Sequence, residues 1–119
     1  MISIKTIIAG SRGINDYYTL LFAVEYAESQ GLAITEVVSG CCSGPDTLGI
    51  RYAEEKGIQL HRYPAEWNRY GKSAGYRRNE VMAENAEALL AIYDGKSKGT
   101  QHMIDLANKH ALKVVVYKP

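Results

Sequence analysis

The sequence predicts an α/β protein of Rossmann-like type, a three-layer αβα sandwich around a five-stranded parallel sheet. Five short apolar stretches recur along the chain, each bounded by glycine, proline or polar residues. Segments in which apolar residues are spaced as on one face of a helix lie between them. Regular alternation of strand and helix implies parallel strands joined by right-handed crossovers, with helices on both faces of the sheet.

The strands are expected at residues 4–9, 34–38, 59–63, 88–93 and 113–117. The third helix is expected at residues 74–85 and the fourth at residues 100–110. Apolar residues three or four positions apart indicate the other helices and the inner face of the fourth: Tyr17, Leu20, Leu21, Val24 and Ala27; Leu48, Ile50 and Ala53; Met103, Ile104 and Ala107.

Length and composition favour one folded domain over residues 1–119. Of the 119 residues, 46% are hydrophobic and 23% charged, and the formal net charge is +1, which is typical of a globular protein and not of a disordered one. The apolar runs are far shorter than the roughly 20 residues that cross a bilayer, and no secretion signal opens the chain. We therefore expect a cytoplasmic protein without a membrane partner.

The cysteines and histidines predict neither a disulfide nor a metal site. Cys41 and Cys42 are adjacent, which strains a disulfide between them, and no base is paired with either thiol, so both are interpreted as small packing residues. The three histidines, His61, His102 and His110, form no recognisable set of metal ligands.

The connections that follow the strands carry nearly all of the unusual residues. They cover residues 10–13, 39–46, 64–78 and 94–100, whereas the helix-to-strand connections are short and plain. Ligands of parallel α/β sheets bind beyond the carboxyl ends of the strands, so all four connections face the expected binding edge. Glycines let the backbone approach a ligand, and a helix start offers unpaired amides and a positive dipole end to an anion. The combination favours a small phosphate-bearing ligand.

The first connection offers Gly10, Ser11 and Arg12. The serine hydroxyl and the arginine guanidinium are suited to phosphate oxygens. An ordinary tight turn with Arg12 in solvent explains the same residues equally well.

In the second connection, Gly40 and Gly44 bracket small residues, and Pro45 stands where a helix takes its first residue. This pattern is typical of a turn that closely contacts a ligand. Asp46 either accepts a hydrogen bond from a ribose or base, or supplies negative charge or a cap to the helix start.

The third connection brings cationic residues to a helix start, as Lys72, Gly75, Arg77, Arg78 and Asn79. They fit a clamp for phosphate or carboxylate, and equally a solvated basic helix start. The two arginines are about 100° apart around a helix, so only one is expected to point at the ligand.

The fourth connection runs from Asp94 to Lys98, Gly99 and Thr100, where the last helix opens. Its backbone amides and the threonine hydroxyl are placed to meet a phosphate. The alternative is a solvated basic turn with Thr100 as the N-cap. Four connections of suitable chemistry at one sheet edge favour a binding site over four unrelated turns.

Together these segments, Gly10-Ser11-Arg12, residues 39–46, Trp67, residues 71–79 and Asp94 through Thr100, resemble the YspA-related branch of the SLOG superfamily. The likeness extends over essentially the whole chain. The superfamily includes LOG-type phosphoribohydrolases and DprA/Smf DNA-processing proteins, and members of this branch are often bacterial or phage-encoded. The resemblance implies a central first strand in the strand order 3-2-1-4-5 and a pocket for nucleotides or nucleotide-derived molecules.

The sequence departs from the LOG-type pattern at one position. Those enzymes follow the glycine-threonine helix start with a catalytic glutamate, and Met103 stands there in this chain. The resemblance matches their arginine with Arg77 or Arg78, and leaves Asp46 or Glu80 to supply acid/base chemistry. The candidate catalytic residues are therefore Arg78, Glu80 and Asp46.

Three functions follow from these observations. The first is binding or sensing of a nucleotide or nucleotide-derived ligand, with no other cofactor. The second is cleavage of a nucleotide at its N-glycosidic bond. The third, DprA-like DNA binding, has less support because the composition offers no broad basic surface. A homo-oligomer is compatible with all three.

Overall fold

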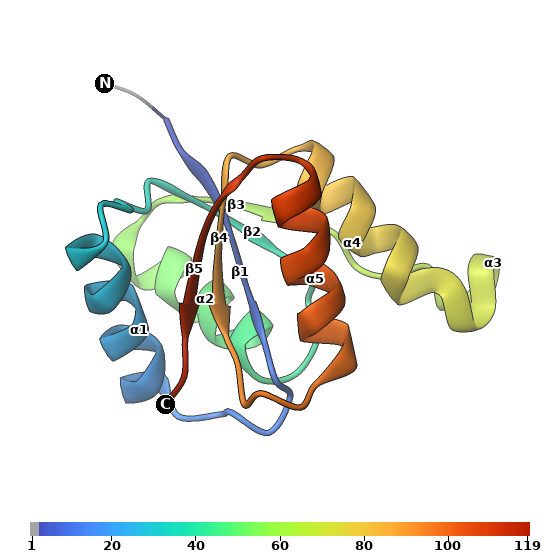
Figure 1. Ribbon diagram of the computed structural model, residues 1–119, viewed down its shortest axis with the longest axis horizontal. Coiled ribbons are helices and arrows are strands. Elements are labelled where there is room, and N and C mark those ends of the chain that lie inside the picture. The colour runs from blue at the N-terminus through green and yellow to red at the C-terminus, as the bar shows by residue number, and fades with distance from the viewer. Residues whose placement is uncertain (1–2) are drawn as a thin grey trace.

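The computed structural model describes residues 3–119 and contains a five-stranded parallel sheet in the order β3-β2-β1-β4-β5 (Figure 1). This confirms the predicted fold class and strand order. All four strand pairs are parallel, with Ile7 of β1 opposite Val38 of β2 and Leu89 of β4. The strands are β1 (Lys5–Gly10), β2 (Glu36–Ser39), β3 (Gln59–Arg62), β4 (Ala88–Ile92) and β5 (Lys113–Tyr117).

Helices cover both faces of the sheet (Figure 1). One face packs against α1 (Tyr17–Ser29) and α2 (Pro45–Lys56), and the other against α4 (Ala74–Glu84) and α5 (Lys98–Lys109). Neighbouring residues of a strand point to opposite faces, so Ile8 joins Leu20 in one core cluster while Ile7 joins Met82 and Met103 in the other. The central strands are buried on both faces, which explains their continuous apolar runs.

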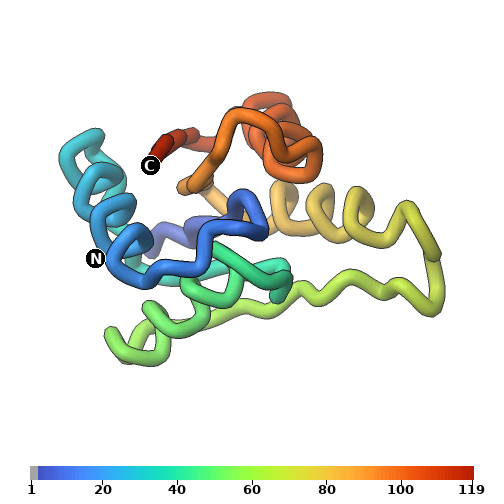
Figure 2. The backbone as a smooth tube through the Cα atoms, turned by 90° about the horizontal axis from the view of Figure 1, so that it is seen from below, coloured from blue at the N-terminus to red at the C-terminus, as the bar shows by residue number. Residues whose placement is uncertain are grey.

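A short helical segment between β3 and α4 was absent from the sequence prediction. It consists of α3 (Trp67–Tyr70) and a single 3₁₀ turn, η1 (Gly71–Ser73). Four residues are too few to show a periodic apolar pattern, so the sequence indicated only a connection there. Figure 2 shows this segment extending away from the other helices. Residues 64–73 are called the arm below.

Two helix starts show how local sequence sets the boundaries. Asp16 caps α1 by accepting a hydrogen bond from the Tyr18 amide at 3.1 Å. Ser97 caps α5 by accepting one from the Thr100 amide at 3.3 Å. The alternative with Thr100 as the N-cap is therefore wrong, because α5 begins two residues earlier than predicted.

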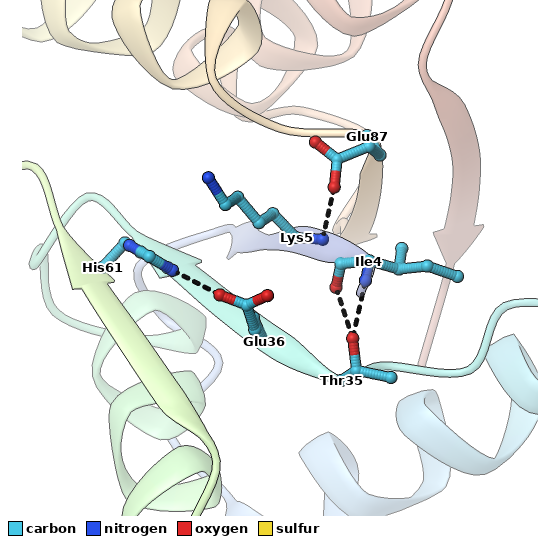
Figure 3. A network of polar contacts seen from close by, with 6 residues as sticks. All are labelled: Ile4, Lys5, Thr35, Glu36, His61 and Glu87. Carbon is cyan, nitrogen blue, oxygen red and sulfur yellow. Dashed lines mark hydrogen bonds and ion pairs between the residues drawn. The ribbon is translucent and has the colours of Figure 1, made fainter. Parts of the chain in front are cut away.

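The amino-terminal edge of the sheet is closed by contacts among its own residues (Figure 3). The Thr35 hydroxyl accepts from the Ile4 amide at 2.6 Å, and Glu87 accepts from the Lys5 amide at 2.8 Å. His61 Nε2 lies 2.8 Å from a Glu36 carboxylate oxygen. These contacts link neighbouring strands at this edge of the sheet. No helix within residues 3–119 is long and apolar enough to cross a membrane.

Candidate ligand-binding site

A cavity of about 420 Å³, called cavity A below, lies at the carboxyl edge of the sheet. It extends from the ends of β1 and β4 to the starts of α2 and α5 and to one side of α4. The connection from β1 leads towards β2, whereas β4 lies on the other side of β1, so this is where the strand order reverses. Crevices at such positions are the usual ligand sites of parallel α/β sheets.

The end of β1 approaches β4 so closely that only glycine fits at position 10. A Cβ there would lie 2.1 Å from the Ile92 carbonyl oxygen and 2.8 Å from Pro45 Cγ. The next residue, Ser11, is buried; its amide donates to the Ile92 carbonyl at 3.0 Å and its hydroxyl accepts from the Asp94 amide at 3.0 Å. These contacts join the first and fourth connections into one wall of cavity A.

The second connection turns sharply around Asp46. Cys41 has a left-handed backbone, with φ of 64°, and the Cys42 amide donates to Asp46 Oδ2 at 3.2 Å. A Cβ at position 40 would lie 2.6 Å from Arg78 Nη1 and 2.8 Å from Asp46 Oδ2, so a larger residue there would displace one of these two side chains. Gly40 thus lets the arginine and the aspartate approach the backbone, and it lies behind the cavity wall.

Asp46 is a buried carboxyl group beside cavity A, with 6% of its surface exposed. Burial raises its pKa from 3.8 to about 6, against the opposing effects of the Cys42 amide and of the Arg78 and Arg12 guanidinium groups. A carboxyl group that titrates near neutral pH inside a cleft is a candidate for proton transfer as well as for ligand binding.

Arg78 is the arginine that faces cavity A. Its Nη1 donates to the carbonyl oxygens of Gly40 and Tyr63, and its Nε donates to Asn79 Oδ1 at 2.9 Å. Its Nη2 lies 3.5 Å from Cys42 Sγ. These bonds hold the guanidinium across the ends of β2 and β3, which accounts for its half-buried position.

Arg77 points away, as expected for a residue about 100° further around the helix. Its Nε donates to the Ser73 hydroxyl at 3.0 Å, and its guanidinium lies 4.5 Å from the centre of the Tyr70 ring. Lys72 is exposed on the arm. Of the three cations of the third connection, only Arg78 therefore lines cavity A.

Asp94 organises the fourth connection. Its Oδ1 accepts from the amides of Lys96 and Ser97 at 2.7 and 2.9 Å, which lowers the pKa of this carboxyl group. The turn delivers the chain to α5, whose first amides, those of Lys98 and Gly99, have no acceptor within the helix. A Cβ on Gly99 would meet no atom within 4 Å, so the cavity is open at this helix start.

The structure brings most of the predicted site residues to cavity A: Gly10, Ser11, Arg12, Asp46, Arg78, Asn79, Asp94, Gly99 and Thr100. Gly40 and Gly44 lie behind its wall, where Gly44 packs on the backbone of Arg12. Four further predicted binding residues do not line it either: Lys72, Gly75, Arg77 and Lys98. Glu80 lines a different cavity on the far side of α4.

The sequence prediction missed Ala9, Cys42, Met82, Ser97 and Met103 in the wall of cavity A. The sulfur of Cys42, which the sequence predicts to be a packing residue, lies between the guanidinium groups of Arg12 and Arg78, at 3.9 and 3.5 Å. Met82 and Met103 are almost fully buried and give the cavity an apolar floor. Within residues 3–119, no three His, Cys, Asp or Glu side chains are grouped to hold a metal ion.

Two comparisons with known proteins bear on this site. The sequence model of the YspA, cpYpsA-related SLOG family matches residues 4–70, which reach from β1 to the end of α3. The Gene 61 protein of Mycobacterium phage D29 is 33% identical over 122 aligned positions, which cover 93% of this chain and 94% of that protein. The similarity to the phage protein therefore extends through α4 and α5, beyond the family match.

Proposed function

The chain belongs to the YspA, cpYpsA-related SLOG family, and we propose that it binds a nucleotide or nucleotide derivative with a phosphate group in cavity A. Membership of this family suggests a nucleotide-related ligand that is either bound or processed. The observation that carries the proposal is the convergence of Ser11, Arg12, Arg78 and the first amides of α5 on one cavity.

The charges of cavity A suit an anion whose binding depends on pH. Arg12 and Arg78 bring two positive charges, and Asp46 and Asp94 bring two carboxyl groups. Because the pKa of Asp46 is about 6, protonation of this residue leaves the arginines in excess below that pH. A phosphate monoester loses part of its own charge in the same range, because its second pKa is about 6. We therefore expect a ligand whose phosphate is a diester, with a constant charge, to bind more tightly at pH 5.5 than at pH 7.5.

A thermal-shift screen followed by mass spectrometry tests the proposal. The probes are nucleoside monophosphates, cyclic and linear dinucleotides, ADP-ribose and ribose 5-phosphate. Stabilisation by a probe that is recovered intact supports a binding or sensing protein. If none of these probes raises the melting temperature, the proposal is wrong and the four connections are ordinary turns.

Gly99→Glu tests whether the phosphate binds at the start of α5, with the least disturbance of the fold. Position 99 has room for a side chain, and a carboxylate there stands at the first turn of α5, where it repels a phosphate. Gly99→Gln is the matched control, because it adds the same bulk without charge. We expect the glutamate to weaken binding at least tenfold more than the glutamine. Equal affinities of the two variants for the ligand would mean that the phosphate does not bind at this helix start.

One observation favours a second function, cleavage of the nucleotide at its N-glycosidic bond. Asp46 titrates near pH 6 at the wall of cavity A, within the range of a general acid or base. Met103 occupies the position of the LOG-type glutamate and is buried, so this chemistry would rest on Asp46. Release of free base that disappears in Asp46→Asn, while binding remains, would support the hydrolase. Intact probes after prolonged incubation would exclude it for those substrates.

A further inference from the structure

A second cavity of about 540 Å³, called cavity B, lies on the other side of α4 from cavity A. It is bounded by the end of β3, the arm and the outer face of α4. Figure 2 shows the arm leaving the body after β3 and returning as α4. Residues from both sides of this excursion line cavity B. Arg78 lines both cavities and forms the wall between them.

The lining of cavity B differs in character from that of cavity A. Tyr63, Pro64, Tyr70 and Val81 provide aromatic and apolar surface, and 43% of the Val81 surface is exposed although the side chain is apolar. Cavity A, in contrast, is lined by hydroxyl groups, backbone amides and charges around a small apolar floor. Cavity B therefore suits a planar apolar group, and cavity A suits an anion.

A planar platform is already formed in cavity B. The Arg77 guanidinium lies 4.5 Å from the centre of the Tyr70 ring and is held by the Ser73 hydroxyl at 3.0 Å. A guanidinium held in this way offers a flat face on which nucleobases stack, as they do on aromatic rings. The sequence left open which of the two arginines faces a ligand, and Arg77, which does not line cavity A, lines cavity B.

Two carboxylates, those of Glu66 and Glu80, lie in the lining of cavity B. Ionised carboxylates only accept hydrogen bonds, so they favour partners that carry N–H groups. Adenine, guanine and cytosine have exocyclic amino groups. Uracil has none, and its single N3–H lies between two carbonyl oxygens, which an acceptor-only carboxylate repels. The carboxylates therefore select for an amino-bearing base.

We infer that cavity B holds the base of the nucleotide whose phosphate occupies cavity A, and that it prefers an amino-bearing base. This inference rests on the proposed function and names the ligand class of the same site. Arg78 is fixed by the Gly40 and Tyr63 carbonyls at the boundary. The ribose then crosses the Arg78 side chain, between the anion and the base.

Titration calorimetry with ribose 5-phosphate and the 5′-monophosphates of adenosine, guanosine, cytidine and uridine tests this inference. Stacking of one base changes affinity by about tenfold or more. We expect ribose 5-phosphate to bind at least tenfold more weakly than the best amino-bearing nucleotide, with the uridine nucleotide also weaker. If ribose 5-phosphate and all four nucleotides bind equally, the base is not recognised and the inference fails, although the phosphate site stands. If none binds, the proposed function fails with it.

Substitutions in cavity B test recognition of the base separately from binding of the phosphate. Tyr70→Ala removes the ring beneath Arg77 and should bring the nucleotide to the affinity of ribose 5-phosphate, without changing the affinity for ribose 5-phosphate itself. Tyr76→Ala is the matched control, because Tyr76 is a half-exposed tyrosine of α4 outside cavity B. Val81→Asp changes an exposed position of the same cavity and serves if Tyr70→Ala does not fold. Unchanged selectivity in a folded cavity B variant would overturn the inference.

Glu80→Gln tests the preference for an amino-bearing base. The replacement keeps the size of the side chain and adds an amide donor, which suits the carbonyl groups of uracil. We expect the ratio of adenosine to uridine nucleotide affinity to fall several-fold, with ribose 5-phosphate unaffected. An unchanged ratio in both Glu80→Gln and Glu66→Gln would exclude the carboxylates from base selection.

Discussion

The wild-type protein is expected to lose stability as the pH rises through 6, and Asp46→Asn is expected to abolish this loss. The folded-state pKa of Asp46 is about 6, against an ordinary value of 3.8, because the carboxyl group is buried. The folded protein therefore holds this proton more tightly than the unfolded chain. The resulting stabilisation is fully present below pH 3.8 and is lost as the pH rises through 6.

The size of the effect follows from the shift. Two pKa units correspond to about 3 kcal/mol once the pH is above both values. About half of this, roughly 1.4 kcal/mol, is lost between pH 5 and pH 7.5, a range in which unfolding is convenient to measure. Asparagine has no such titration, and its Oδ1 atom still accepts from the Cys42 amide, which donates to Asp46 in the wild type.

Urea denaturation of both proteins at pH 5, 6, 6.5 and 7.5 measures the difference in unfolding free energy. We expect Asp46→Asn to gain about 1.4 kcal/mol relative to wild type across this range. Asp105→Asn, which removes a carboxylate from an exposed position of α5, is the control and must not show the same gain. A difference between Asp46→Asn and wild type that is constant with pH would refute the raised pKa and weaken the hydrolase hypothesis.

Two further predictions concern packing and assembly. Gly10→Ala should destabilise the protein by about 3 kcal/mol in urea denaturation, because the new Cβ meets the Ile92 carbonyl. Gly99→Ala is the control, and it should be neutral or slightly stabilising because position 99 lies in open space on a helix. Similar effects of the two substitutions would contradict the close approach of β1 and β4. If the chain forms a homo-oligomer, we expect the contact on α1, where Tyr18, Phe22 and Tyr26 are 71%, 59% and 41% exposed and recur every four residues. Phe22→Ser should then lower the mass seen by light scattering after size exclusion, and an unchanged oligomer would place the contact elsewhere.

Several features of the site could be predicted because they depend on residues close together in sequence. The strand-to-helix connections lie at one edge whatever the details of packing, since parallel strands put all their carboxyl ends on the same side. Pro45 begins α2 as its sequence position indicates. Nine of the predicted residues meet in cavity A for this reason.

Other features could not be predicted because they depend on distant partners. Arg78 and Gly40 are 38 positions apart, and only the folded chain shows that the guanidinium bonds the Gly40 carbonyl while Arg77 turns to Tyr70. The position of Cys42 in the wall of cavity A was unpredictable for the same reason, because its sulfur contacts two arginines that come from other connections. The arm that encloses cavity B contains a helix of four residues, which is too short for a periodic signal.

The sequence by itself therefore determined the alternation of strands and helices, the sheet edge that carries the unusual connections, and the residue types in those connections from which an anion site is predicted. It did so because backbone hydrogen bonding and the periodicity of burial act over a few neighbouring residues. The tertiary structure alone decided which arginine faces cavity A, that glycine is required at position 10 by the close approach of β4, and that a second, aromatic cavity shares Arg78 with the first. These features depend on which surfaces come within a few ångströms of one another when the layers pack. A local sequence pattern contains no information about such distances.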